Sequence, residues 1–214
     1  MATTLLRKTV LTAAGIAATT GGIAGPAIAA HATPAPKTAV VADRTSGDRE
    51  LDVRYQAQPN FYYCGPAAAR NAISVLGKNI DVDTMAKEMG TTEDGTNSIN
   101  DITPVLNKET GKTYKSVEIK TPKADDKQTD TLRTDIVRTI DDGRAVVANI
   151  AGTTTDTDGN PHAFEGGHYI SIVGYQNGGK TVTIADSANP NTASYHITVD
   201  HLADWIATRG YSTS

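Results

Sequence analysis

The sequence predicts an α+β fold, with helices in the first half of the chain and an antiparallel sheet in the second. Three segments of helical composition follow one another between residues 65 and 110. Apolar, β-branched segments separated by tight turns follow between residues 145 and 199. The chain has one cysteine, Cys64, in the helical half, and four of its five histidines lie in the sheet half. We therefore expect an N-terminal helical half that carries the cysteine and a C-terminal antiparallel sheet that carries a functional histidine.

Residues 1–29 have the pattern of a secretory signal peptide. Arg7 and Lys8 precede a stretch without charged residues that continues to Ala30, and Ala27-Ile28-Ala29 has the small-x-small pattern of a cleavage site. Glycine and proline interrupt the stretch before it reaches the roughly 20 apolar residues that a membrane span needs. We predict a secreted, extracellular protein with no membrane contact after signal cleavage.

Residues 30–50 are predicted to be a flexible leader, because they contain proline and charged residues without an apolar period. The remaining residues, 51–214, suit a single compact domain. The chain has 20 basic and 24 acidic residues, a net charge of -4 at pH 7 and no recurring basic cluster. This surface gives no electrostatic basis for binding nucleic acid, so we expect no nucleic-acid partner. The mature chain is expected to be a monomer.

The first half of the domain is predicted to contain three helices and a weak strand. The first helix covers residues 65–76 and has Pro66 in its first turn, where the missing N–H needs no intrahelical partner. The other helices cover 83–89 and 98–110, and a weak strand covers 114–119. The cysteine therefore lies at the N-terminus of the first helix.

The second half is predicted to be a meander of strands framed by two helices. Apolar residues at helical spacing predict a helix over 131–142, and a closing helix is expected over 199–208. Residues 151–165 are predicted to be a polar loop. Strands are expected at residues 145–150, 168–175, 181–186 and 194–199.

Cys64 is the candidate nucleophile. A single cysteine cannot form a disulfide within its own chain, and the secreted setting is oxidising. The positive end of a helix dipole favours a thiolate, and so does a neighbouring imidazolium. The alternative is an apolar packing role for Cys64 beneath the first helix.

His168 is the candidate general base, because it alone among the histidines opens an apolar strand directly after the Gly166-Gly167 pair. Asp186 ends the neighbouring strand, so its carboxylate could orient the imidazole if the hairpin register permits. Gln58, six residues before the cysteine, could donate its amide N–H to an oxyanion, with Gln56 as the alternative donor.

This ordered set of residues resembles the C39-like cysteine peptidases. The resemblance spans about Leu51 to Gly210 and rests on Gln58, Cys64-Gly65-Pro66-Ala67, the segment from Gly167 to Tyr175, and Asp186. It implies a papain-like cysteine peptidase fold for residues 51–214, with Cys64 as nucleophile, His168 as general base and acid, Asp186 as orienting residue and Gln58 as oxyanion-hole donor. One departure is Ser187, which follows the aspartate where the family often has proline.

The predicted function is that of a secreted cysteine peptidase that hydrolyses amide bonds of a peptide or protein substrate through a Cys-His-Asp triad and an acyl-enzyme. No cofactor or metal is expected. The alternatives are another thiol acyl transfer, such as deamidation or transglutamination, and a catalytically inactive C39-like binding module. A zinc site built from Cys64, His162 and His168 is the less favoured hypothesis, because their spacing does not match a known zinc motif.

Overall fold

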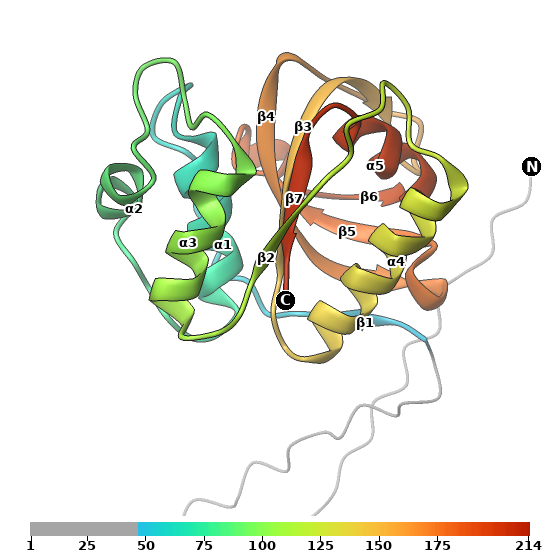
Figure 1. Ribbon diagram of the computed structural model, residues 1–214, viewed down its shortest axis with the longest axis horizontal. Coiled ribbons are helices and arrows are strands. Elements are labelled where there is room, and N and C mark those ends of the chain that lie inside the picture. Colours follow the sequence, from blue (N-terminus) through green and yellow to red (C-terminus); the bar gives the residue numbers. More distant parts are fainter. Residues whose placement is uncertain (1–46) are drawn as a thin grey trace, which may run out of the picture. The chain divides into compact units, whose positions relative to one another are not determined.

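An antiparallel sheet with helices on both faces organises residues 47–214, the part of the chain that this computed structural model describes (Figure 1). The predicted signal peptide and the leader as far as residue 46 lie outside the described residues. The main sheet has the strand order β2-β7-β3-β4-β5-β6, and β1 pairs with the end of β4. Its strands are β1 (Arg49–Glu50), β2 (Lys115–Glu118), β3 (Val146–Thr155), β4 (Pro161–Gln176), β5 (Thr181–Ala185), β6 (Ser194–Thr198) and β7 (Gly210–Thr213).

Five α-helices of the described chain cover the two faces of this sheet. They are α1 (Cys64–Ser74), α2 (Val82–Glu88), α3 (Ile99–Thr110), α4 (Asp126–Asp141) and α5 (Val199–Ile206). Two short 3₁₀ turns, η1 (Asn177–Gly179) and η2 (Pro190–Thr192), follow β4 and precede β6. Helices α1–α3 lie on one side of the sheet and α4 and α5 on the other (Figure 1). The predicted mixture of helices and antiparallel sheet is confirmed.

The alternation of side chains along β3 explains why both faces carry a hydrophobic core. Val146, Ala148 and Ile150 belong to the cluster that packs with α4 and α5. Val147 belongs to the cluster that packs with α1 and α3. Successive side chains of a strand point to opposite faces, so a strand that is apolar throughout needs cover on both sides.

Helix α1 is fixed closely to β4, which places the start of the helix over the sheet. The hydroxyl of Ser171 on β4 donates to the carbonyl oxygen of Ala68 on α1 at 2.7 Å, and both residues are buried. Gly65 allows a second close contact, because a Cβ there would lie 2.9 Å from Cβ of Thr96 and nearer still to its Oγ1. Thr96 is buried, and its hydroxyl is 2.7 Å from that of Thr91. The absence of a side chain at residue 65 therefore lets the loop before α3 lie against α1.

Gly65→Ala is expected to lower the free energy of unfolding by about 1–3 kcal/mol, because the added methyl group overlaps the buried Thr96 side chain. Gly166→Ala is the matched control, since a Cβ at Gly166 would meet nothing within 4 Å and its φ is not in the left-handed region. The control should stay within about 0.5 kcal/mol of wild type in urea denaturation. Equal losses in both variants would contradict the close contact at Gly65.

The hairpin formed by β3 and β4 is longer than the sequence predicts. The expected polar loop at 151–165 instead continues both strands, with Thr153 paired to Ala163 and Thr155 to Pro161. Three consecutive threonines, residues 153–155, end β3 there; threonine is β-branched and suits a strand, although its polarity resembles that of a loop. A register shift between Ile150 and Gly152 marks the place where the buried part of the hairpin passes into the exposed part.

Two further elements differ from the sequence prediction. Helix α4 begins at Asp126 rather than at residue 131, because Asp125 and Gln128 form a reciprocal capping box at its N-terminus. Strand β7 was not predicted, because its Ser212 and Thr213 are polar. Both are buried and use their hydroxyls in hydrogen bonds within the core. Paired hydroxyls therefore replace apolar side chains in this strand.

Arg49 and Glu50, the last two residues of the predicted leader, form β1 and pair with Tyr175 and Gly174 of β4. They belong to the sheet rather than to a flexible segment. Between residues 47 and 214, none of the helices has the length and apolar character needed to cross a bilayer.

Candidate active site

Cys64 is the first residue of α1 and is nearly buried, with 9% of its surface exposed. The turn from Asn60 to Tyr63 leads into the helix, and Pro66 occupies its first turn as the sequence predicts. Because α1 packs against β4, the thiol lies near His168 of that strand and contributes to the raised pKa of its imidazole. The structure thus brings together the cysteine and the histidine from the two halves of the sequence.

His168 and Asp186 form a buried pair. Nε2 of His168 lies 2.8 Å from Oδ1 of Asp186, and each residue has less than 5% of its surface exposed. The pairing of β4 with β5, which aligns Ser171 with Ala185, carries Asp186 back toward the start of the buried part of β4. The ring of Phe164 stacks on the imidazole, with ring centroids 4.0 Å apart and planes at 15°. With Nε2 engaged by the carboxylate, Nδ1 is the nitrogen that can exchange a proton with Cys64.

The electrostatics of the pair favour a charged imidazole. Burial alone lowers the pKa of His168, but the hydrogen bonds and charges of Asp186 and Cys64 outweigh it and raise the pKa to about 9. Burial raises the pKa of Asp186, but the hydrogen bond and charge of His168 dominate and hold it below its usual value. At neutral pH the pair is therefore an imidazolium beside a carboxylate.

Tyr195 also binds this carboxylate, and the sequence did not reveal it. Its hydroxyl donates to Oδ2 of Asp186 at 3.0 Å, while the backbone N–H of Ala188 donates to Oδ1 at 2.9 Å. Burial and the nearby Asp186 charge raise the pKa of Tyr195, so the hydroxyl keeps its proton. Tyr195 lies on β6 opposite Ile184, and this pairing is the only signal that could have placed it near Asp186.

Tyr195→Phe is expected to lower kcat for any reaction of this site while leaving KM unchanged, because the carboxylate that holds the imidazole loses one of its donors. Tyr211→Phe is a matched control, since Tyr211 is also buried and donates to a buried carboxylate, that of Asp135, at 3.0 Å. Both variants should lose about 1.5–3 kcal/mol of unfolding free energy, the usual worth of a hydrogen bond to a charged group. An equal fall in kcat in both variants would mean that the effect is purely structural.

Gln58 lies beside the residue that follows Asp186. Its backbone N–H donates to the carbonyl oxygen of Ser187 at 2.9 Å, and its Oε1 accepts from the Ser187 hydroxyl at 3.1 Å. Its Nε2 donates one hydrogen to the carbonyl oxygen of Asn60 at 2.9 Å, which leaves the second hydrogen of the amide. Ser187, the departure from the family pattern, therefore holds Gln58. The alternative residue, Gln56, has its backbone N–H and C=O tied to the side chain of Asn71.

His162 is engaged elsewhere, so the zinc hypothesis gains no support. Its Nε2 lies 3.0 Å from Oδ2 of Asp156, and its ring stacks on Tyr195 with centroids 3.8 Å apart. Within residues 47–214, no three His, Cys, Asp or Glu side chains converge in a way that could hold a metal ion.

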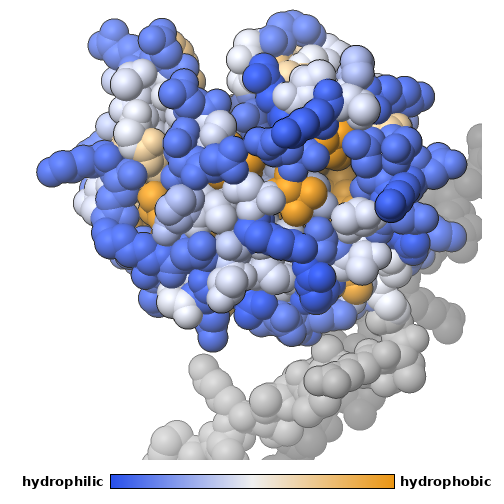
Figure 2. Space-filling view, viewed as in Figure 1, coloured by the Kyte–Doolittle hydropathy of each residue, from blue (hydrophilic) through white to orange (hydrophobic). Residues whose placement is uncertain are grey.

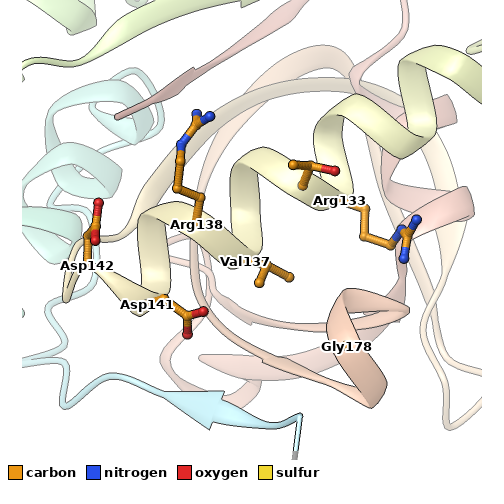
Figure 3. Close-up of a pocket in the computed structure, with 7 residues that line it drawn as sticks. Arg133, Val137, Arg138, Asp141, Asp142 and Gly178 are labelled. Atoms are coloured by element: carbon orange, nitrogen blue, oxygen red, sulfur yellow. The ribbon is translucent and has the colours of Figure 1, made fainter.

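The described surface has a notch and a separate hollow. Figure 2 shows a notch at the upper edge of the molecule, between the loops above α1–α3 and the β3–β4 end of the sheet. A separate hollow of about 470 Å³ lies along α4 and beside Gly178 (Figure 3). Its charged side chains are already paired: Arg138 with Asp135, and Asp142 with Arg144. It borders the helix on the sheet face opposite α1, away from Cys64.

The comparisons with known proteins agree with this architecture. The model of the Peptidase_C39 like family matches residues 50–213. A protein from Bacillus anthracis assigned as a C39-like peptidase is similar in structure, with a TM-score of 0.52, 11% identity, and coverage of 78% of this chain and 98% of that chain. At this identity the likeness concerns the fold alone. No curated protein sequence matches the chain.

A second solved structure is the peptidase domain of Streptococcus ComA, a bifunctional ABC transporter involved in quorum sensing. Its TM-score is 0.49 at 16% identity, and the alignment covers 74% of this chain and 96% of that chain.

Proposed function

Because the chain belongs to the Peptidase_C39 like family, we propose that it is a secreted, monomeric cysteine peptidase that hydrolyses amide bonds through Cys64, His168 and Asp186. The observation that supports this function is the buried imidazole held between a carboxylate and the cysteine that begins α1. Burying a charged pair costs free energy, because both groups lose their hydration. This pair supplies the base, the acid and the orienting group that thiol catalysis needs.

The proposed reaction proceeds through an acyl-enzyme. The thiolate of Cys64 attacks the carbonyl carbon of the scissile amide and forms a C–S bond, with the negative charge on the former carbonyl oxygen. The free N–H of Gln58 and the backbone N–H of Cys64 stabilise that oxygen. The C–N bond then breaks as Nδ1 of His168 gives its proton to the leaving amine.

Water completes the cycle. His168, now neutral, takes a proton from a water molecule, whose oxygen attacks the thioester carbon. The C–S bond breaks, the acid product leaves, and the thiolate and imidazolium are restored. Asp186 keeps Nε2 protonated throughout and stabilises the positive charge of the ring. No cofactor enters any step.

The test is cleavage of a mixed peptide library by the protein without its signal peptide, with Cys64→Ala as the inactive control. Mass spectrometry should detect new termini with the wild type only. Iodoacetamide labelling against pH, followed at the single cysteine, should show a reactive thiol that His168→Gln weakens. Absence of cleavage above the control would overturn the peptidase proposal.

The same experiment separates the alternatives. Glutamine converted to glutamate without chain cleavage would indicate a deamidase, and joining of an added amine would indicate a transglutaminase-like transfer. Binding of library peptides with no chemical change would indicate a binding module.

A further inference from the structure

A hollow of about 200 Å³ opens between the start of α3, the end of β2 and the turn before β7. Its polar lining includes Asn97, Lys120, Asn149 and Arg209. None of these residues has a part in the proposed chemistry. The hollow is large enough for a side chain of a bound peptide.

Arg209 is the charged residue of this hollow whose side chain has no partner among the described residues. Its backbone is fixed on both sides, because its N–H donates to the carbonyl oxygen of Ile206 and its own carbonyl accepts from Ile119, each at 2.9 Å. Its side chain is exposed and makes no ion pair or hydrogen bond with the residues that the structure describes. A guanidinium on a fixed backbone without a partner is suited to an incoming acceptor.

This guanidinium lies next to the residue that precedes the candidate base. Nη2 of Arg209 would be 3.6 Å from a Cβ atom at Gly167, and His168 follows directly in the chain. Gly167 has a φ of +93°, a conformation that favours glycine. Because Gly167 has no side chain, the guanidinium of Arg209 can lie close to the backbone of β4 at this point.

A chain of contacts links Asn149, which lines the hollow, to the residue that follows Cys64. Nδ2 of Asn149 donates to the hydroxyl of Tyr169 at 3.0 Å, and that hydroxyl donates to the carbonyl oxygen of Thr96 at 3.1 Å. The side chain of Thr96 lies against Gly65, the residue after Cys64. Two residues that line the hollow are therefore linked to the chain neighbours of the site residues: Arg209 to Gly167 directly, and Asn149 to Gly65 through Tyr169 and Thr96.

The two acidic groups near the hollow both have hydrogen-bond or ion-pair partners. Oε2 of Glu118 pairs with Nζ of Lys120 at 3.2 Å, and its Oε1 accepts from Nδ2 of Asn100 at 3.1 Å. Asp101 accepts from the backbone N–H of Ser98 within the capping box of α3. Among the charged side chains that line the hollow, Glu118 and Lys120 pair with each other, so Arg209 is the one without an ion-pair partner in the described part of the chain, and its charge is positive.

We propose that this hollow is a substrate subsite that accepts a carboxylate through Arg209, so that the enzyme prefers peptides with aspartate or glutamate within a few residues of the scissile bond. A guanidinium can bind both carboxylate oxygens at once, and a neutral amide of the same shape cannot replace that pairing. This subsite rests on the proposed peptidase function. A carboxylate at a peptide C-terminus has the same chemistry, and the experiment distinguishes the two sources.

The experiment compares kcat/KM for pairs of cleaved peptides that differ only by glutamate or glutamine at one position, scanned along the sequence. At one position the wild type should prefer glutamate by about tenfold, the equivalent of one charge-assisted hydrogen bond. Arg209→Gln should abolish this preference and Arg209→Glu should reverse it in favour of glutamine. Arg133 is a half-exposed arginine on α4 that pairs with Asp130, and Arg133→Gln, the control, should leave the preference intact. Peptides with a free and an amidated C-terminus test the other source of the carboxylate.

Binding of the same peptides to Cys64→Ala, with and without Arg209→Gln, tests the subsite without turnover. Tighter binding of the acidic peptide that is lost with Arg209→Gln is expected. Equal kcat/KM and equal affinity for both members of every peptide pair would overturn the subsite while leaving the peptidase function intact. Failure of the wild type to cleave any peptide would count against the function, and the binding data would still decide the subsite.

Discussion

His168→Gln is expected to lower kcat/KM for peptide cleavage by about 10²–10⁴-fold, the usual contribution of general acid-base catalysis. Glutamine can still donate a hydrogen bond to the buried carboxylate of Asp186, so that carboxylate keeps a donor in place of the imidazole. It cannot carry a proton between the thiol, the leaving amine and water. The fall should therefore appear in kcat, while circular dichroism remains that of the wild type.

His201→Gln is the control for this prediction. His201 is exposed, and its Nδ1 lies 3.0 Å from the carbonyl oxygen of Thr155, outside the site. The control should keep wild-type kcat/KM. Similar activity in the two variants would show that the imidazole at residue 168 does not take part in the reaction.

Asp186→Asn is expected to move the alkaline limit of activity to lower pH. In the wild type the pKa of His168 is raised to about 9, so the imidazolium persists at neutral pH and kcat/KM should fall as the pH rises through about 9. The amide removes the carboxylate's charge, while burial continues to lower the pKa of His168. With each unit of lowered pKa, kcat/KM at pH 9 should fall by up to about tenfold, and the pH profile from 5 to 10 measures the shift.

The free energy of unfolding should also change with pH as His168 titrates. A raised pKa in the folded state stabilises the fold fully below the ordinary histidine value of 6.5, and this contribution is lost as the pH rises through about 9. The wild type should therefore lose unfolding free energy between these two pH values, and Asp186→Asn should lose less. Asp156→Asn, which alters the other His-Asp pair of the described chain, should leave the activity profile in place. A profile that Asp186→Asn does not move would contradict the charged pair.

The sequence predicts those parts of the site that depend on local chemistry. The start of α1 at Cys64 follows from the proline and alanines after it, and the strand that contains His168 follows from its apolar run. Asp186 could be proposed because a hairpin register relates it to His168. These features involve neighbouring residues or adjacent strands.

The remaining parts depend on contacts between distant segments, which local patterns do not encode. Strand β7 is polar, and it becomes a core strand only because Thr103 and Thr139 supply partners for its hydroxyls. Tyr195 binds Asp186 because β6 pairs with β5. Arg209 comes near Gly167 because the turn before β7 passes the start of the buried part of β4.

The alignment of β4 with β5 also decides when during folding the site can exist. Strand side chains alternate between faces, so a slip of one residue in the pairing of Ser171 with Ala185 would turn Asp186 away from His168. A newly made chain whose central hairpin has not yet formed has a thiol but no oriented base. Under the proposed function, reactivity is thus acquired only when the sheet is complete, and an unfinished chain should cleave neither itself nor its unfolded neighbours.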